Sequence, residues 1–273
     1  MHIHINPATI HAFDRLAHYG DGCFTTAAFS NGHVEYLPAH LARLERDAQS
    51  LALPFRSESI QKLHTVLVEL AAKHRDGTLK VLISSGLSER GYQRAEAPVI
   101  QAYVFILPKV ARYDDWRENG ISVALATTPL NHSPEYAGHK HANRLEQVLL
   151  KEQIPAGCDD ALVLNEEGHL VETTAANVFF RIGQCWYTPE IIKCGVNGVM
   201  RNRVMQLMGD NKQPVQEIMM ASSELKRVNA MFICNSLMRI VPVHRLSLGK
   251  DESFKLDIAR VSSIQQLVDH DIS

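Results

Sequence analysis

The residues best suited to chemistry lie in one stretch, HSPEYAGHKHANRLEQ, at positions 132 to 147. It holds His132, His139 and His141 around one lysine, Lys140. Imidazoles this close together suggest a metal site, but no carboxylate or thiolate follows at ligand spacing, so the pattern favours no metal. A lysine becomes a nucleophile when burial or nearby cations keep its amine neutral. The stretch is therefore a nucleophilic lysine or a histidine-rich surface loop, with a metal site as the least favoured alternative.

A carboxylate with unusual neighbours is the second candidate. Glu172 lies in GHLVETTAANVFF, where small uncharged residues follow it and the next strand is apolar. A glutamate in a strand is commonly an exposed, alternating residue. In apolar surroundings, however, its carboxylate needs a cationic or N–H partner, and a protonated ring nitrogen would qualify.

Three features could bind an anion. The loop GVNGVMRNRV (195–204) leads into a helix, whose first amides are unpaired and whose dipole favours negative charge. Ser236 could add a hydroxyl, and Arg43 lies off the apolar stripe of its helix. A turn after a helix and a solvated arginine are the structural alternatives. An amine, a carboxylate, a guanidinium and loop amides together fit pyridoxal 5′-phosphate.

The composition favours small-molecule chemistry. The 273 residues suffice for one large or two smaller domains, and 45% hydrophobic with 21% charged residues is ordinary for a globular protein. A net charge of −2 gives no reason to expect nucleic acid or a membrane surface as partner. The N-terminus lacks a signal-peptide pattern and no apolar run reaches ~18 residues, so we expect a cytoplasmic protein. Five scattered cysteines argue against a disulfide framework and a structural zinc site.

The first part of the chain predicts a small α/β domain, residues 1–110. Two β-rich runs within 25–37 surround Asn31-Gly32, a pair suited to a tight hairpin turn. Apolar spacing then predicts helices over 38–53 and 59–77, strands over 78–85 and 99–108, and a polar loop over 86–98.

The second part predicts a larger α+β domain, residues 121–273, that carries the lysine. Residues 111–120 are polar and are expected to be the linker between the two domains. Strands are expected over 121–130, 159–189 and 230–243, with hairpin turns at EEG and RIGQ, and a closing helix over 255–271. The fold class is α+β with two domains.

The sequence resembles the fold type IV pyridoxal-phosphate enzymes over nearly the whole chain, in the order of its segments as well as in their residues. The resemblance rests on YGDGCFTTA, LKVLISSGLSERGY, GHKHANRLEQVLL, ALVLNEEGHLVETTAANVFF, GVNGVMR and ICNSLM. Within the family, these segments are most similar to those of the 4-amino-4-deoxychorismate lyases. The family's aminotransferases more often show GITR-type and TGTA-like sequences at the last two sites.

The resemblance implies a role for several residues. It makes Lys140 the Schiff-base lysine and Glu172 the partner of the pyridinium nitrogen, and it places Arg43 at the cofactor phosphate. The amides of Val199 and Met200 match the phosphate loop, although Met200 stands where the family more often has a threonine and so lacks its hydroxyl.

The remaining implied residues belong to the phosphate and the substrate. Asn235 or Ser236 would lie near the phosphate. Arg90, Tyr92 and Arg94, in the loop SERGYQR, are candidates for binding substrate carboxylates, since a guanidinium pairs a carboxylate in a bidentate way.

The function that the resemblance implies is a lyase of folate biosynthesis. It would convert 4-amino-4-deoxychorismate to 4-aminobenzoate and pyruvate, as a homodimer with the cofactor between the two domains. Alternatives are a D- or branched-chain amino-acid aminotransferase of the same fold and, from a different class, a non-catalytic protein that binds a metal or ligand through its histidines.

Overall fold

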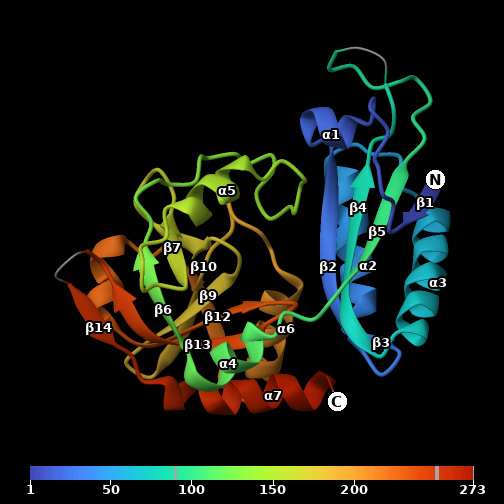
Figure 1. The fold of residues 1–273 in the computed structure, drawn as a ribbon. Helices are drawn as coiled ribbons and strands as arrows, with labels where there is room; N and C mark the ends of the chain where they lie inside the picture. Colours follow the sequence, from blue (N-terminus) through green and yellow to red (C-terminus); the bar gives the residue numbers. More distant parts are fainter. Residues whose placement is uncertain (89–90, 250–251, 273) are drawn as a thin grey trace. The chain divides into compact units, whose positions relative to one another are not determined.

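The computed structural model describes residues 1–88, 91–249 and 252–272 (Figure 1). The chain forms two compact units. Unit 1 comprises Met1–Val110 and His139–Arg144, and unit 2 comprises Ala111–Gly138 and Leu145–Ser273. Within the described residues, no helix combines the length and the apolar character needed to cross a membrane.

Unit 1 is a five-stranded sheet with helices. Its strands are β1 (His2–Ile5), β2 (Gly22–Ser30), β3 (His33–Val34), β4 (Asp76–Ser84) and β5 (Gln101–Leu107), and its helices are α1 (Arg15–Tyr19), α2 (Leu37–Ser50) and α3 (Ser57–Lys73). The strand order is β1-β5-β4-β2-β3, with β1 parallel to β5 and the other pairs antiparallel. The hairpin predicted at Asn31-Gly32 is confirmed, and both residues have the positive φ (50° and 82°) that a tight turn requires.

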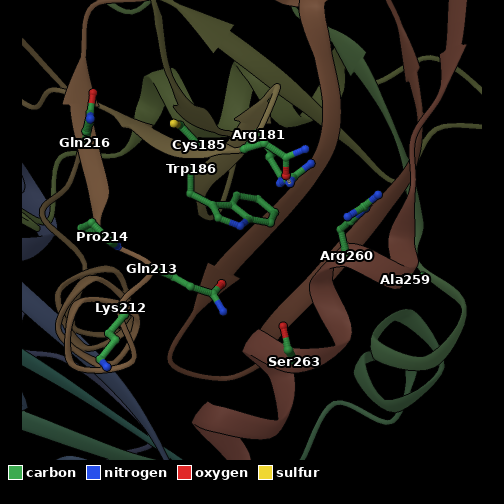
Figure 2. Close-up of a pocket in the computed structure, with 11 residues that line it drawn as sticks. Arg181, Cys185, Trp186, Lys212, Gln213, Pro214, Gln216, Ala259, Arg260 and Ser263 are labelled. Atoms are coloured by element: carbon green, nitrogen blue, oxygen red, sulfur yellow. Dashed lines mark hydrogen bonds between the residues drawn. The ribbon is translucent and has the colours of Figure 1, made fainter.

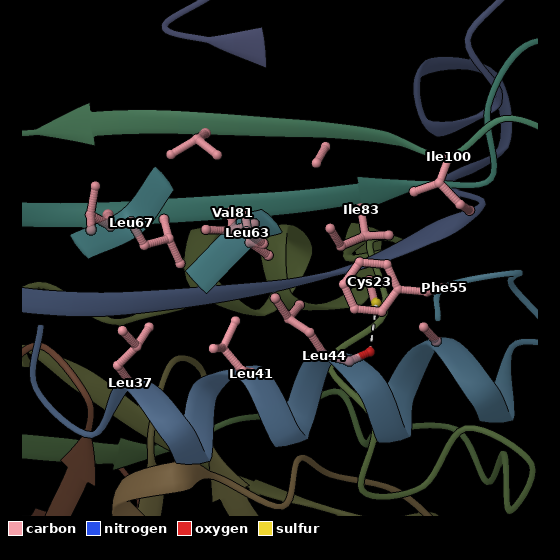
Figure 3. Packing of buried hydrophobic residues seen from close by; sticks show 14 of the residues in the cluster. Cys23, Leu37, Leu41, Leu44, Phe55, Leu63, Leu67, Val81, Ile83 and Ile100 are labelled. Atoms are coloured by element: carbon pink, nitrogen blue, oxygen red, sulfur yellow. Dashed lines mark hydrogen bonds between the residues drawn. The ribbon is translucent and has the colours of Figure 1, made fainter. Parts of the chain in front are cut away.

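The core of unit 1 explains why its helices form. Leu41, Leu44 and Ala48 share the inner face of α2 and are buried in one core with strand residues such as Val81 and with Leu63 and Leu67 of α3 (Figure 3). The helix α3 stops at Lys73, earlier than the predicted end at Gly77. Gly77 instead belongs to β4, where an added Cβ would lie 2.9 Å from the Phe29 ring, so this glycine serves close packing.

Unit 2 contains an eight-stranded path plus one further strand. Its strands are β6 (Ile121–Leu125), β7 (Asp160–Leu164), β8 (Leu170–Thr173), β9 (Asn177–Ile182), β10 (Cys185–Pro189), β11 (Val215–Ile218), β12 (Val228–Asn235), β13 (Arg239–Ser247) and β14 (Ser253–Lys255). Its helices are α4 (Arg112–Asn119), α5 (Leu145–Glu152), α6 (Val199–Asp210), α7 (Ser262–Ile272) and the short 3₁₀ segments η1 (Ser222–Arg227) and η2 (Ile258–Val261).

The sheet of unit 2 runs in the order β11-β10-β9-β12-β13-β6-β7-β8, with β14 beside β13. The hairpins predicted at EEG and RIGQ form the β7–β8 and β9–β10 connections. Together the two units are the predicted α+β, two-domain fold.

The segment expected to be a linker is a helix instead. Residues 112–119 form α4, and it packs against β13. Tyr113 and Trp116 contact the core of unit 2, whereas the rest of the helix is polar. Two aromatic residues among so many charges gave too weak a periodic signal to predict a helix.

Lys140 also lies elsewhere than expected, because residues 139–144 pack with unit 1 and not with the larger unit. The N–H of Phe24 donates to the carbonyl of Lys140 (2.9 Å), and the N–H of Ala142 donates to the carbonyl of Gly22 (2.8 Å). The short strand β3 pairs only with Phe29 and Ser30 of β2. Residues 140–142 therefore satisfy backbone groups at the other end of β2 that β3 leaves unpaired.

Candidate active site

A buried carboxylate holds the backbone of Lys140. Asp47, on α2, has no solvent exposure, and its Oδ2 accepts the N–H of Lys140 at 3.0 Å. Its Oδ1 accepts from Nδ1 of His139 (3.0 Å) and from Nη2 of Arg46 (2.9 Å). A carboxylate is buried at tolerable cost only when such donors surround it. The Lys140 backbone is thus held on both sides, through its carbonyl by β2 and through its N–H by Asp47.

The side chain of Lys140 lies over an aromatic ring. Its Nζ is 4.6 Å from the centre of the Phe24 ring, and Lys80 and Arg144 approach the same ring at 5.7 and 6.0 Å. Cations are attracted to the face of such a ring. Arg144 also donates to the carbonyls of His139 (2.9 Å) and His141 (2.8 Å), which keeps the lysine segment in one conformation.

The three histidines do not share one environment. His139 is bound to Asp47, and His141 is half-buried, where burial and then Arg144 lower its pKa to about 4. His132 belongs to unit 2, and its backbone N–H donates to Glu166 at 3.1 Å. Within residues 1–88, 91–249 and 252–272, no group of three or more histidines, cysteines or acids is arranged to hold a metal ion.

Arg43 ends in a buried polar network. It is 5% exposed, and its Nη2 donates to Oγ1 of Thr25, which lies 2.6 Å from Nδ1 of His40. Burial and then Arg43 lower the pKa of His40 far below its usual value, so this imidazole stays neutral. Burial lowers the pKa of Arg43 to about 10. Its buried Nε has no acceptor among the described residues, and such a donor is suited to an anion.

Glu172 is buried in unit 2, which excludes the alternative of an exposed strand residue. It is 6% exposed on β8, and its Oε2 accepts the N–H of Val196 at 3.0 Å. Asn177 donates from Nδ2 to the carbonyl of Val196 at 2.8 Å. The neighbouring Gly195 has a φ of +91°, and an added Cβ would lie 2.7 Å from Val171. Glu172 and Asn177 therefore hold the loop that precedes α6.

The N-terminus of α6 offers unpaired amides. Its N-cap, Gly198, is extended and no side chain caps the helix. In the described part of the chain, the N–H groups of Val199 and Met200 donate to no other group. The Met200 side chain is 1% exposed, so it adds packing at this position and no polar contact. A helix of 12 residues that begins in this way is suited to an anion.

Asn235 and Ser236 differ in what they can still bind. The Oδ1 of Asn235 accepts the N–H groups of Leu237 (2.9 Å) and Met238 (3.0 Å), and its Nδ2 donates to Ala175 (3.2 Å). Asn235 therefore builds the β12–β13 turn. Ser236 is 9% exposed, and its hydroxyl has no hydrogen bond within the described residues. Of the two, Ser236 is better suited to bind a phosphate.

The loop predicted to face a substrate is held by arginines. Tyr92 is 87% exposed, and Arg90 lies outside the described residues. Arg94 binds Asp21 through Nε (3.0 Å) and donates from Nη1 to the carbonyls at the end of α2. The contact of these three residues with a substrate stays a prediction, and the structure gives Arg94 a role in holding the loop.

Sequence reasoning missed three residues that build these sites. Asp47 has a signal, because it stands beside Ala48 on the inner face of α2, where an acid is rare. Arg15 and Asp21 carry no such signal in the sequence, because their roles depend on contacts with distant residues. Arg15 donates to Asp21 (2.7 Å) and to loop groups as distant as Gln93. Only the three-dimensional structure brings these segments together.

Comparison with known proteins identifies the family of the chain. Residues 22–246 match the amino-transferase class IV family, and the chain belongs to that family. It is 36% identical over 246 residues to an aminodeoxychorismate lyase from Vibrio harveyi, covering 88% of each chain. It is 27% identical to a D-alanine aminotransferase from Bacillus licheniformis, covering 84% of this chain and 80% of that one. The crystal structure of 4-amino-4-deoxychorismate lyase from Pseudomonas aeruginosa superposes with a TM-score of 0.88 at 29% identity, covering 97% and 94% of the two chains.

Replacing Asp47 with asparagine should destabilise the protein by about 2 kcal/mol, the usual worth of hydrogen bonds to a buried charge. The amide would turn a donor toward the N–H of Lys140 or toward His139. Urea unfolding measures the change. The control is Asp76→Asn, whose carboxylate is half-exposed and 4.0 Å from Arg75, and which should change the unfolding free energy little. Equal effects of the two substitutions would contradict the anchoring role of Asp47.

Asp21 should make stability depend on acid pH. Burial raises the pKa of Asp21, but hydrogen bonds from Arg94, Arg15 and Ser85 outweigh burial and lower it from 3.8 to about 2. The ionised form is therefore favoured by folding, and its contribution is complete above pH 3.8 and lost as the pH falls toward 2. Urea unfolding of the wild type and of Asp21→Asn at several pH values should show a stability difference that narrows in this range. A difference in unfolding free energy that does not change with pH would contradict this role of Asp21.

Proposed function

We propose that this protein is a pyridoxal-phosphate-dependent lyase that converts 4-amino-4-deoxychorismate to 4-aminobenzoate and pyruvate, a step of folate biosynthesis. The observation that carries the proposal is Lys140, a lysine whose backbone is held on both sides, within a segment that resembles the lyases. The relative from Vibrio harveyi and the solved lyase from Pseudomonas aeruginosa support the substrate.

The residues of each unit fit pyridoxal phosphate. In unit 1, the buried Nε of Arg43 lacks an acceptor, and a phosphate oxygen would supply one. In unit 2, the unpaired amides of Val199 and Met200 and the hydroxyl of Ser236 are phosphate donors. The buried carboxylate of Glu172 is an acceptor for a ring N–H. When bound, the cofactor supplies an aldehyde for amines and a ring that takes up the electron pair left by a departing proton.

The protein's own residues would orient the substrate and move one proton. Lys140 would hold the cofactor through its amine and, once released, would take the proton from the amine-bearing ring carbon of the substrate. Glu172 would keep a proton on the cofactor's ring nitrogen. The carbon–oxygen bond to the enolpyruvyl group then breaks, enolpyruvate gains a proton to become pyruvate, and the six-membered ring becomes aromatic. Aromatisation makes this step downhill, so positioning is the main task of the protein.

The alternative within the family is an aminotransferase, which the D-alanine aminotransferase relative favours. It would use the same lysine but return the proton to the cofactor and release a keto acid. Incubation of the protein with D-alanine or leucine, followed by absorbance for conversion of the cofactor to its amine form, tests this reaction. Pyruvate release from 4-amino-4-deoxychorismate without such conversion supports the lyase.

Replacing Lys140 with alanine should abolish pyruvate release from 4-amino-4-deoxychorismate, because both the cofactor bond and the base are lost. The visible absorbance that borohydride reduction abolishes should also disappear. The control is Lys62→Ala on the exposed side of α3, which should keep both properties. Full pyruvate release by the Lys140→Ala variant would show that the assignment is wrong.

We also infer that two copies of the chain associate. The helix α5 exposes three large apolar side chains at i, i+3 and i+4 spacing, Leu145 (65%), Val148 (56%) and Leu149 (54%), so they share one face of the helix. Apolar side chains gathered in this way are typical of surfaces that another chain covers. The resemblance to the family implies that the partner is a second copy, since these enzymes are homodimers.

The substitution Leu149→Glu should shift the protein from dimer to monomer, because it places a charge in an apolar interface. Light scattering after size-exclusion chromatography measures the mass. Val68→Glu, on α3 and 40% exposed, is the matched control and should leave the mass unchanged. A wild-type protein that runs as a monomer would contradict the inference.

A further inference from the structure

A polar cavity lies in unit 2, apart from the residues discussed above. It has a volume of about 500 Å³ and is lined by the β9–β10 hairpin, the segment that follows α6, η2 and the start of α7. This volume is within the range of small-molecule sites. Figure 2 shows Arg181, Trp186, Gln213, Arg260 and Ser263 around it. Of the eleven described residues that line the cavity, three are cationic and none is acidic.

Arg181 is a buried cation without an anionic partner. It is 8% exposed on β9, and its guanidinium donates to amide oxygens of Gln184 and of Asn229 (3.5 Å). Neither acceptor carries charge, and the described residues provide Arg181 with no ion pair. Burying a positive charge without a counter-charge is costly. An anion in the cavity would remove that cost.

Three neighbours extend this donor surface. Trp186 pairs with Arg181 across the β9–β10 hairpin, so both side chains lie on the same face. It is 5% exposed, and its indole N–H donates to no other described residue. Gln213 and Ser263 supply an amide and a hydroxyl that reach the same space (Figure 2). The cavity therefore presents several neutral donors beside one buried charge.

The other two cations, Arg260 and Lys212, differ in how strongly neighbouring negative groups already compensate their charge. Arg260 donates from Nε to Asp257 at 3.1 Å, but both side chains are about half-exposed, so this surface pair is weak. Lys212 lies just past the C-terminal end of α6, where the helix dipole already favours a cation. Arg181 and Arg260 are thus the cations available to pair with an anionic ligand.

The cavity is distinct from the proposed cofactor site. It is lined by Lys212, Gln213 and Pro214, which follow the C-terminal end of α6, whereas the amides of Val199 and Met200 begin this helix of 12 residues. At 1.5 Å per residue, the two ends of the helix are roughly 18 Å apart. A ligand in the cavity would therefore leave the N-terminus of α6 available.

We propose that this cavity binds a small organic anion through a carboxylate or phosphate group, which Arg181 and Arg260 pair and which Trp186, Gln213 and Ser263 orient. The proposal does not rest on the proposed lyase function.

Tryptophan fluorescence tests the proposal. The chain has two tryptophans, so Trp116→Phe leaves Trp186 as the only reporter. Titration of this variant with inorganic phosphate and, separately, with benzoate distinguishes a phosphate ligand from a carboxylate ligand. We expect saturable binding of at least one of the two, weakened by salt. In the same background, Arg260→Gln should weaken binding about tenfold, the lower end for loss of a charge-assisted hydrogen bond, and Arg260→Lys should restore part of it.

The controls separate this cavity from other anion sites. Arg227→Gln removes an exposed arginine paired with Glu224, and Lys140→Ala removes the proposed catalytic lysine; both should leave the Kd unchanged. Isothermal titration calorimetry on the same variants detects binding that does not alter the emission. Absence of saturable binding by both methods, or equal Kd values for Arg260→Gln and Arg227→Gln, would overturn the proposal. The proposal would also be overturned if Arg260→Gln changed the molecular mass of the protein and no anion bound to the cavity. That result would show that the cavity serves contact between chains.

Discussion

The structure of unit 1 depends on the buried carboxylate of Asp47. A fully buried charge is stable only when donors surround it. Arg46, one donor to Asp47, is its neighbour in the chain, whereas His139 and the N–H of Lys140 come from a segment some ninety residues later, which the fold must bring to Asp47. The buried carboxylate is therefore stable only when the lysine segment lies beside α2. If the lysine segment moved, Asp47 would lose two of its donors at once.

The same principle recurs in unit 2. Glu172 accepts the N–H of Val196, Asn177 binds the carbonyl of the same residue, and the chain between them and α6 has little freedom left. In both units, then, a buried polar group fixes the backbone next to a residue proposed to do chemistry. Preorganisation of this kind is what positioning a reactive group requires, because small displacements reduce reaction rates strongly.

Much of the fold could be predicted from the sequence, and the exceptions have identifiable causes. The Asn31-Gly32 hairpin, the apolar face of α2 and the strands of unit 2 follow from local patterns, which depend on neighbours in the chain. The helix α4 was missed because Tyr113 and Trp116 were too few to reveal a period. Glu172 and Lys140 were identified as candidates, but not Asp47, Arg15 or Asp21. Their roles depend on contacts across long separations, and a single sequence carries no record of such contacts.

The pairing of residues 140–142 with β2 has a consequence for synthesis of the chain. Unit 1 is not one continuous stretch, because its last piece, His139–Arg144, follows 28 residues that belong to unit 2. When Val110 has been made, the ribosome must add 34 more residues before the first end of β2 can be covered, which takes roughly 2–7 s at typical elongation rates. During that interval β2 has an open edge and Asp47 lacks its later donors. The newly made first unit therefore passes through a stage in which one edge of β2 still presents unpaired backbone groups.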